Sequence, residues 1–123
     1  MRPDNFHFKN GILNIEDTSL DKVVAEFKTP FYVYTKASIL EACRAYTSDI
    51  DSTDLVCYAV KANSNLQILK ILADEGLGFD VVSGGELSRV IKIGADPKKI
   101  VFSGVGKTKE ELSMAAELDI FSI

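Results

Sequence analysis

Histidine, cysteine and tryptophan are scarce in this chain, and their scarcity narrows the chemistry that it can carry. The 123 residues include one histidine, two cysteines and no tryptophan. Cys43 and Cys57 lack the CxxC spacing of metal and redox motifs, and both lie within apolar patterns. We therefore expect two buried thiols and no zinc site.

Long apolar runs and clusters of positive charge are also missing. No run approaches the roughly 20 apolar residues that a membrane-spanning helix needs, and the first residues lack the apolar core of a signal peptide. The lysines and arginines are scattered, and the net charge of −4 argues against a nucleic-acid surface. We expect a cytoplasmic protein that binds neither membrane nor nucleic acid.

The remaining composition is that of one small globular domain. Hydrophobic residues make up 46% of the chain and charged residues 26%, which is ordinary for a folded soluble protein. Near the N-terminus, apolar and polar residues alternate around Asn10-Gly11, a pair typical of tight hairpin turns. This pattern predicts strands over residues 6–9 and 12–16, and the apolar spacing that follows predicts a helix over residues 20–27.

After Pro30 the pattern changes to strands alternating with helices. Five apolar runs, about 20 to 24 residues apart, start near Phe31, Leu55, Gly78, Ile100 and Ile120. The alternation implies a parallel sheet, with edge strands predicted at 31–34 and 120–123. Periodicity leaves open whether helices cover both faces or the sheet closes into a barrel. A complete (β/α)8 barrel needs roughly 250 residues, so about half of one would be present.

Capping patterns mark where the helices after Pro30 begin. A hydroxyl residue followed three positions later by Glu or Gln satisfies the free N–H groups of a first helical turn. The predicted caps are Thr35 and the patterns Ser64-x-x-Gln67, Ser83-x-x-Glu86 and Thr108-x-x-Glu111.

Lys61 directly follows the apolar run 55–60 and precedes Ala62-Asn63. Such a run is typical of a buried strand, and the carboxyl ends of parallel strands form the ligand-binding face of α/β folds. A primary amine there can reach a bound ligand, and a neutral lysine amine is the nucleophile of Schiff-base chemistry. From this residue alone, a lysine that extends from a strand end into water is the simpler alternative.

Two motifs carry a resemblance to a known family. The segments Tyr58-Ala-Val-Lys-Ala-Asn63 and Gly78-Phe-Asp-Val-Val-Ser-Gly-Gly-Glu-Leu87 closely resemble the alanine-racemase-like barrel family of pyridoxal-phosphate enzymes. The resemblance covers about residues 6 to 123. Within the family, the sequences of these two segments are most similar to those of decarboxylases acting on meso-diaminopimelate.

The resemblance implies a fold of two parts. Residues 29–123 would form the first half of a pyridoxal-phosphate-binding (β/α)8 TIM barrel. Residues 1–28, a short hairpin and a helix, would pack with a missing C-terminal β-domain. The family's remaining cofactor-binding groups come later in the chain, so these 123 residues by themselves are expected to lack decarboxylase activity.

The resemblance also implies a cofactor and its site. Lys61 would hold pyridoxal 5′-phosphate through an imine, and Asp80 would lie near the lysine and influence its charge and position. Glu86 matches a further cofactor-binding position, although it also completes the capping pattern that starts at Ser83. Lys61 and Asp80 are thus the expected catalytic residues, and no metal is expected.

The implied reaction converts meso-diaminopimelate to L-lysine and CO2, carried out by a homodimer on a small amino-acid substrate. Related decarboxylases of ornithine, arginine or carboxynorspermidine are the nearest alternatives. Two alternatives belong to other classes, a non-catalytic binding or dimerisation fragment and a nucleotide-binding domain built on Gly104-Val-Gly-Lys-Thr108. The last is disfavoured because a P-loop needs glycine where Val101 stands.

Overall fold

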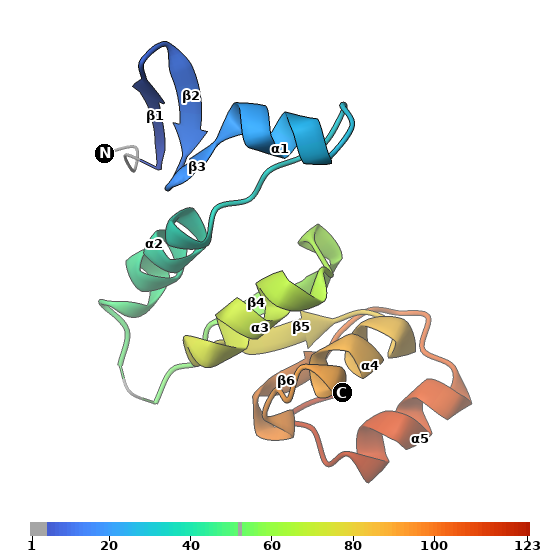
Figure 1. Cartoon of the computed structure of the whole chain (residues 1–123). Coiled ribbons are helices and arrows are strands. Elements are labelled where there is room, and N and C mark those ends of the chain that lie inside the picture. The colour runs from blue at the N-terminus through green and yellow to red at the C-terminus, as the bar shows by residue number, and fades with distance from the viewer. Residues whose placement is uncertain (1–4, 52) are drawn as a thin grey trace. The chain divides into compact units, whose positions relative to one another are not determined.

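The computed structural model describes residues 5–51 and 53–123 (Figure 1). The chain forms two compact units, Met1–Ala42 and Cys43–Ile123, and each is described by itself. The helix α2 (Lys36–Thr47) begins in the first unit and ends in the second.

The first unit contains the predicted hairpin and helix. Its antiparallel sheet has the order β1-β2-β3, with β1 (Phe6–Lys9), β2 (Ile12–Ile15) and β3 (Thr18–Ser19), and α1 (Leu20–Glu26) follows. Asn10 and Gly11 have φ of 54° and 78°, the left-handed conformations that a two-residue hairpin turn requires. Glu16 has φ of 50°, which ends β2 one residue earlier than predicted.

The strand predicted at residues 31–34 is wrong, because no residue from 31 to 35 pairs with another strand within the described residues. Tyr32 is 93% exposed, so this apolar run is not buried there. An apolar run becomes a strand only where a second backbone offers hydrogen bonds, and residue type cannot supply that partner. The helix after it starts as predicted, since the Ser38 N–H donates to Thr35 Oγ1 at 3.1 Å.

The second unit alternates strands and helices, as the apolar pattern predicts. Its parallel sheet has the order β4-β5-β6. The strands are β4 (Cys57–Ala59), β5 (Gly78–Val81) and β6 (Ile100–Phe102). The helices are α3 (Leu66–Asp74), α4 (Gly84–Lys92) and α5 (Lys109–Glu117), with short 3₁₀ turns η1 (Val60–Ala62) and η2 (Pro97–Lys99). Each strand therefore lies beside the one that precedes it in the chain.

The strand predicted at residues 120–123 is wrong as a full strand. Only Ser122 pairs, in a single parallel bridge with Val101 beside β6. The Phe102 N–H donates to the Ser122 carbonyl at 2.9 Å, which continues the order β4-β5-β6 by one residue pair. One pair is too short a ladder for a strand, although it lies where the apolar pattern places one.

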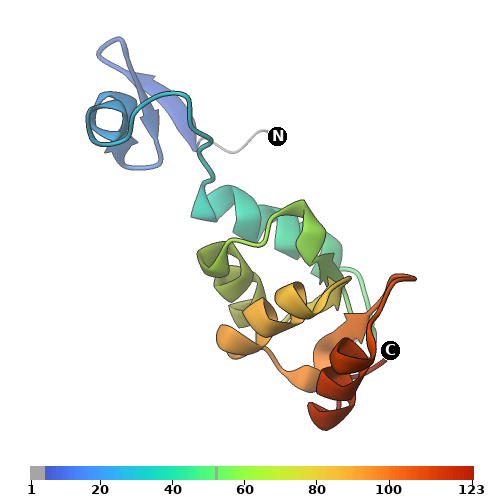
Figure 2. The same cartoon turned by 90° about the vertical axis from the view of Figure 1, so that its right-hand side faces the viewer.

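One face of the parallel sheet packs against helices. Figure 2 shows α3, α4 and α5 on one side of the strands, as right-handed crossovers place them when strands are added in one direction. The largest fully buried side chains belong to this layer: Val60, Leu69, Phe79, Val81, Leu87, Val90, Ile100 and Phe102. Because side chains alternate along a strand, Gly78 and Asp80 belong to the opposite face from Phe79 and Val81.

Three of the four predicted helix caps are found, and one is replaced by its neighbour. Ser83 and Thr108 accept N–H groups of α4 and α5 through their side chains. The helix α3 is capped by Asn65, whose Oδ1 accepts the Gln67 N–H at 2.9 Å, and not by Ser64 as predicted. Asparagine and serine cap equally well, so the pattern does not distinguish two adjacent candidates.

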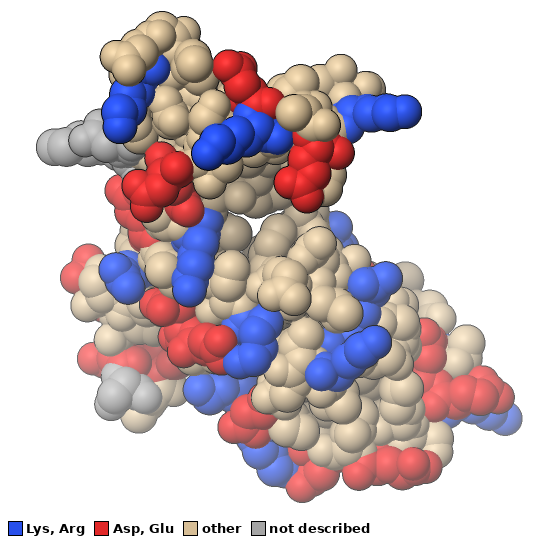
Figure 3. Space-filling view, viewed as in Figure 1, with Lys and Arg blue, Asp and Glu red and all other residues tan. Residues whose placement is uncertain are grey.

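Two further features concern the length of the helices and the distribution of charge. No helix within residues 5–51 and 53–123 is long and apolar enough to cross a membrane. On the face drawn in Figure 3, lysine and arginine side chains lie among aspartate and glutamate side chains rather than in a separate patch. This face therefore lacks the concentrated positive charge typical of nucleic-acid-binding surfaces.

Candidate functional site

Lys61 lies in the tight turn η1 at the carboxyl end of β4. The predicted strand over residues 55–60 is shorter in the structure, since β4 ends at Ala59 and Val60 turns into the core, where it is fully buried. Lys61 is exposed, and its side chain makes no hydrogen bond or ion pair with the described residues. The turn thus presents a free amine at this end of the sheet.

The Lys61 turn is held by the strand before it and the cap after it. The Tyr58 hydroxyl donates to the Asn63 carbonyl at 3.3 Å, which closes the segment containing Lys61. Asn63 Oδ1 in turn accepts the Asn65 N–H at 3.0 Å, just before α3. The amine therefore projects from a backbone that is fixed on both sides.

Asp80 lies on β5 at the same end of the sheet. It pairs with Ala59 of β4 on one side and with Val101 of β6 on the other. Its Oδ1 accepts a hydrogen bond of 2.5 Å from Ser103 Oγ, just after β6. No ion pair joins Asp80 to Lys61 among the described residues. The structure thus brings both residues to the carboxyl end of the sheet without an ion pair between them among the described residues.

Ser103 is a polar neighbour of this site that the sequence analysis missed. Besides its bond to Asp80, its N–H donates to the Val81 carbonyl at 2.9 Å, so it is tied to β5 at two points. A signal was available, because Ser103 follows the apolar run 100–102 as Lys61 follows its own run. A polar residue directly after a parallel strand lies on the ligand-binding face.

Glu86 lies in the first turn of α4, and its side chain accepts a hydrogen bond from the backbone. Its Oε2 accepts the Val82 N–H at 2.9 Å, and its own N–H donates to Ser83 Oγ at 3.2 Å. In an ordinary capping box this carboxylate would accept the N–H of the cap residue, Ser83. Here it accepts the N–H one residue earlier, and Glu86 therefore holds the turn that follows Asp80. Its predicted role in cofactor binding remains a prediction.

Cys57 lies on the same sheet face as Asp80. Burial raises the pKa of the Cys57 thiol, and the nearby Asp80 carboxylate raises this pKa further. Cys57 is only half-buried, so the prediction of a buried thiol is wrong for it, whereas Cys43 is buried as predicted. For Cys43 too, burial raises the thiol pKa, followed by the effect of Glu75. Both thiols are held in the protonated form, which is the unreactive one.

The loop from Gly104 to Thr108 does not have the interactions of a P-loop. Lys107 Nζ donates to the Gly104 carbonyl at 2.8 Å and lies 5.3 Å from the ring centroid of Phe102. Thr108 Oγ1 accepts the Glu111 N–H at 3.2 Å as the N-cap of α5. The lysine and the threonine that would bind phosphate and magnesium in a P-loop are therefore engaged within the chain.

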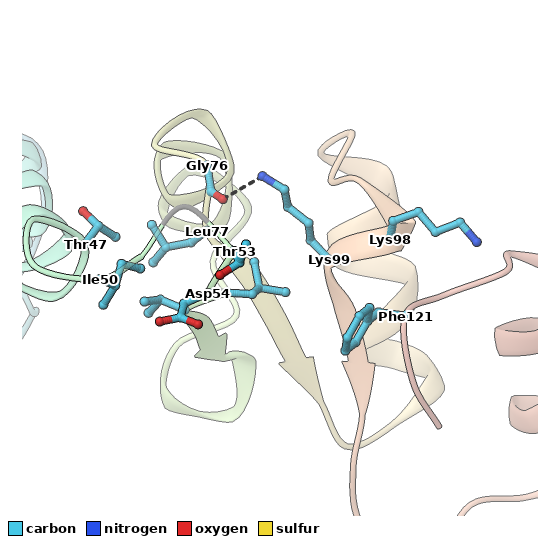
Figure 4. A pocket seen from close by; sticks show the side chains of 11 residues that line it. Thr47, Ile50, Thr53, Asp54, Gly76, Leu77, Lys98, Lys99 and Phe121 are labelled. Carbon is cyan, nitrogen blue, oxygen red and sulfur yellow. Dashed lines mark hydrogen bonds between the residues drawn. The ribbon is translucent and has the colours of Figure 1, made fainter.

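A separate pocket of about 320 Å³ lies at the opposite end of the sheet (Figure 4). It is lined by residues that precede β4 and β5, including Leu55 and Leu77, and by Lys99 and Phe121. Lys99 Nζ donates to the Gly76 carbonyl at 3.0 Å, the bond drawn in Figure 4. Because this pocket is at the amino ends of the strands, it is not part of the site around Lys61 and Asp80.

Comparison with known proteins gives a consistent set of relatives. Residues 36–123 match the family described as "Pyridoxal-dependent decarboxylase, pyridoxal binding domain". Diaminopimelate decarboxylase of Pseudomonas aeruginosa is 47% identical over 118 residues, which are 95% of this chain and 28% of that protein. The chain thus spans little more than a quarter of the length of the curated relatives it matches.

Solved structures agree with these sequence matches. Diaminopimelate decarboxylase from Helicobacter pylori, complexed with L-lysine, is similar with a TM-score of 0.79 and 44% identity, over 83% of this chain and 26% of that chain. Ornithine decarboxylase from Entamoeba histolytica is similar with a TM-score of 0.71 and 26% identity, over 82% of this chain and 32% of that chain.

Proposed function

Because this chain belongs to the pyridoxal-dependent decarboxylase family, we propose that it forms the Lys61 side of a cofactor site in an enzyme that converts meso-diaminopimelate to L-lysine and CO2. The observation that carries the proposal is the placement of Lys61. Its amine is exposed and free of partners at the carboxyl end of a parallel sheet, beside the Asp80 and Ser103 pair.

The residues of this site suit pyridoxal phosphate. Lys61 would hold the cofactor covalently through Nζ, and its lack of a competing ion pair leaves the amine available for that bond. When bound, pyridoxal phosphate supplies an electron sink for the bond that breaks at the substrate carbon. Asp80, oriented by Ser103, would place a negative charge on this side of the site, and Glu86 would hold the backbone turn next to it.

The partial barrel is also part of the proposal. The sequential order β4-β5-β6, with its helices on one side, supports a singly wound (β/α)8 barrel over residues 29–123. The sheet face with Gly78 and Asp80 would then face the barrel interior. Residues 1–28 would pack with a C-terminal β-domain, and the complete enzyme would be a cytoplasmic homodimer.

Diaminopimelate is favoured over ornithine as the substrate because the chain shares more sequence identity with a diaminopimelate decarboxylase than with an ornithine decarboxylase. The chain is 44% identical to the Helicobacter pylori diaminopimelate decarboxylase and 26% identical to the Entamoeba histolytica ornithine decarboxylase over a similar share of its length. We expect the complete enzyme to release CO2 from meso-diaminopimelate with a kcat/KM at least about 10⁴-fold above that for L-ornithine or L-arginine, the order of discrimination that a site with hydrogen bonds to a polar substrate group achieves. A higher kcat/KM for ornithine or arginine would instead identify one of the related decarboxylases, and nucleotide binding without decarboxylation would contradict the family chemistry.

Asp80 offers a direct test of the proposed electrostatics. The substitution Asp80→Asn removes the negative charge and keeps an oxygen that can accept the Ser103 hydroxyl. We expect kcat/KM for diaminopimelate to fall about 10²-fold, as it does when one preorganised electrostatic group is removed from an active site. The measurement is the initial rate of CO2 release by the complete enzyme.

Ser103→Ala is the matched control for Asp80→Asn, because it removes the hydrogen bond that Asp80→Asn can keep and leaves the Asp80 charge in place. We expect a loss of activity smaller than about tenfold for this variant, which corresponds to one hydrogen bond. Equal activities for Asp80→Asn and the wild type would refute a role of the Asp80 charge in the reaction.

A further inference from the structure

We propose that Glu111 is a positioning residue of this site, whose carboxylate fixes the turn between β5 and α4 that follows Asp80. No motif points to this role, since in the sequence Glu111 only completes the capping pattern that starts at Thr108. The inference rests on the proposed function only for its activity measurement, because the geometry itself is independent of any cofactor.

A single carboxylate joins the beginnings of two helices. Glu111 Oε2 accepts the Thr108 N–H at 2.9 Å and so completes the capping box of α5. Its Oε1 accepts the Gly84 N–H at 2.6 Å, across 27 positions of sequence, at the first residue of α4. Both helices begin at the carboxyl end of the sheet, so the bridge lies on the side of the sheet that carries Lys61 and Asp80.

Gly84 is fitted closely to this carboxylate. A Cβ atom added at Gly84 would lie 3.0 Å from Glu111 Cγ and 3.2 Å from Glu111 Oε1, which is tighter than ordinary van der Waals contact. At the neighbouring Gly85, an added Cβ would meet nothing closer than Ser83 Oγ at 3.8 Å. Of these two glycines, only Gly84 must therefore lack a Cβ atom for Glu111 to approach this closely.

The bridge completes a set of contacts around the turn after Asp80. Glu86 holds the Val82 N–H, and Ser103 holds the Asp80 carboxylate at the start of the following loop. Glu111 holds Gly84 from the first turn of α5, just after that loop. The loop between β6 and α5 is thus flanked by a tie to β5 before it and a tie to the beginning of α4 after it. Loss of the Glu111 tie would free the turn, and a displaced turn would move the adjacent Asp80.

The substitution Glu111→Gln separates positioning from simple helix capping. Glutamine replaces one of the two carboxylate oxygens by an NH2 donor, so it can no longer accept the Gly84 and Thr108 N–H groups on separate oxygens. We expect amide hydrogen exchange in residues 82–86 of the complete enzyme to become about tenfold faster, as for the loss of one charge-assisted hydrogen bond. We expect kcat for decarboxylation to fall about tenfold while KM changes less than about threefold, because the affected group positions reacting groups and does not bind substrate.

Thr108→Ala is the matched control. It removes the Oγ1 acceptor of the Glu111 N–H and weakens the cap of α5, but it leaves both bonds of the Glu111 carboxylate in place. We expect a lowered melting temperature for Thr108→Ala, with exchange in residues 82–86 and kcat within about twofold of the wild type. Gly84→Ala crowds the Glu111 side chain and leaves the bond from the Glu111 N–H to Thr108 Oγ1 in place, so it should reproduce the faster exchange if Glu111→Gln fails to fold.

The same contact predicts a pH dependence. The Thr108 N–H and then the Gly84 N–H lower the pKa of the Glu111 carboxyl below its ordinary value. A group with a lowered pKa in the folded state contributes stability above its unfolded pKa of about 4.3, and this contribution is lost as the pH falls through the folded pKa. The difference in melting temperature between wild type and Glu111→Gln should therefore be constant from about pH 6 to 8 and should shrink below about pH 4.

Two results would overturn the positioning role. One is unchanged exchange of residues 82–86 in both Glu111→Gln and Gly84→Ala. The other is a fall in kcat for Thr108→Ala equal to that for Glu111→Gln, which would reduce Glu111 to the cap of α5. A wild-type enzyme that releases no CO2 would refute the proposed function instead, while the exchange measurements would still decide the role of Glu111.

Discussion

Replacement of Lys61 by alanine is expected to lower decarboxylation by the complete enzyme at least about 10³-fold, because removal of a covalent nucleophile commonly costs this much or more. Lys61 is exposed and has no partner among the described residues, so its loss removes the amine without disturbing packing or an ion pair. The folded state should therefore keep its stability while activity disappears. The measurements are the rate of CO2 release and the melting temperature.

Covalent labelling with pyridoxal phosphate tests the role of Lys61 independently of activity. Borohydride reduces an imine between pyridoxal phosphate and a lysine to a stable amine, and peptide mapping then locates the label. We expect the label on Lys61 in the wild type and no label in Lys61→Ala. Lys92→Ala is the matched control, since Lys92 is an exposed lysine of α4 that also makes no hydrogen bond or ion pair within the described residues. Label on another lysine, or an active Lys61→Ala enzyme, would refute the assignment.

Replacement of Phe79 by alanine is expected to lower the free energy of unfolding by about 3–5 kcal/mol. Phe79 is fully buried on the central strand β5, on the face covered by helices, and it pairs with Tyr58 and Ile100 on either side. A cavity at this position cannot collapse easily, because strands flank it on both sides. The expected loss is a large fraction of the roughly 5–15 kcal/mol that stabilises a typical domain.

Phe121→Ala tests whether burial, and not residue type, sets this loss. Phe121 has the same side chain but is 65% exposed, and its backbone hydrogen bonds do not depend on that side chain. We expect a change below about 1 kcal/mol for Phe121→Ala, as for other surface substitutions. Urea unfolding followed by circular dichroism measures both variants. Similar losses for Phe79→Ala and Phe121→Ala would contradict the packing described here.

Features that depend on near neighbours in the chain could be predicted from the sequence. The turn at Asn10 and Gly11, the caps Thr35 and Thr108, and the alternation of strands and helices after residue 55 agree with the structure. Each depends on residues a few positions apart, because turn conformations, capping bonds and side-chain periodicity are local. The extent of pairing at residues 31–34 and 120–123 was predicted wrongly, since a strand exists only where a distant backbone pairs with it.

The candidate site also has residues that could be predicted from the sequence and contacts that could not. Lys61 could be proposed from its place after an apolar run, and Asp80 from the resemblance of the contiguous motif around it to a known family. Only the tertiary structure brings Ser103 to Asp80 across 23 positions and Glu111 to Gly84 across 27. Neither pair has a recognisable spacing, because the parallel sheet and its crossovers decide which loops meet. The chemistry available to this protein was therefore determined by residue type and local order, whereas the positions of its supporting contacts were decided by the pairing of β4, β5 and β6.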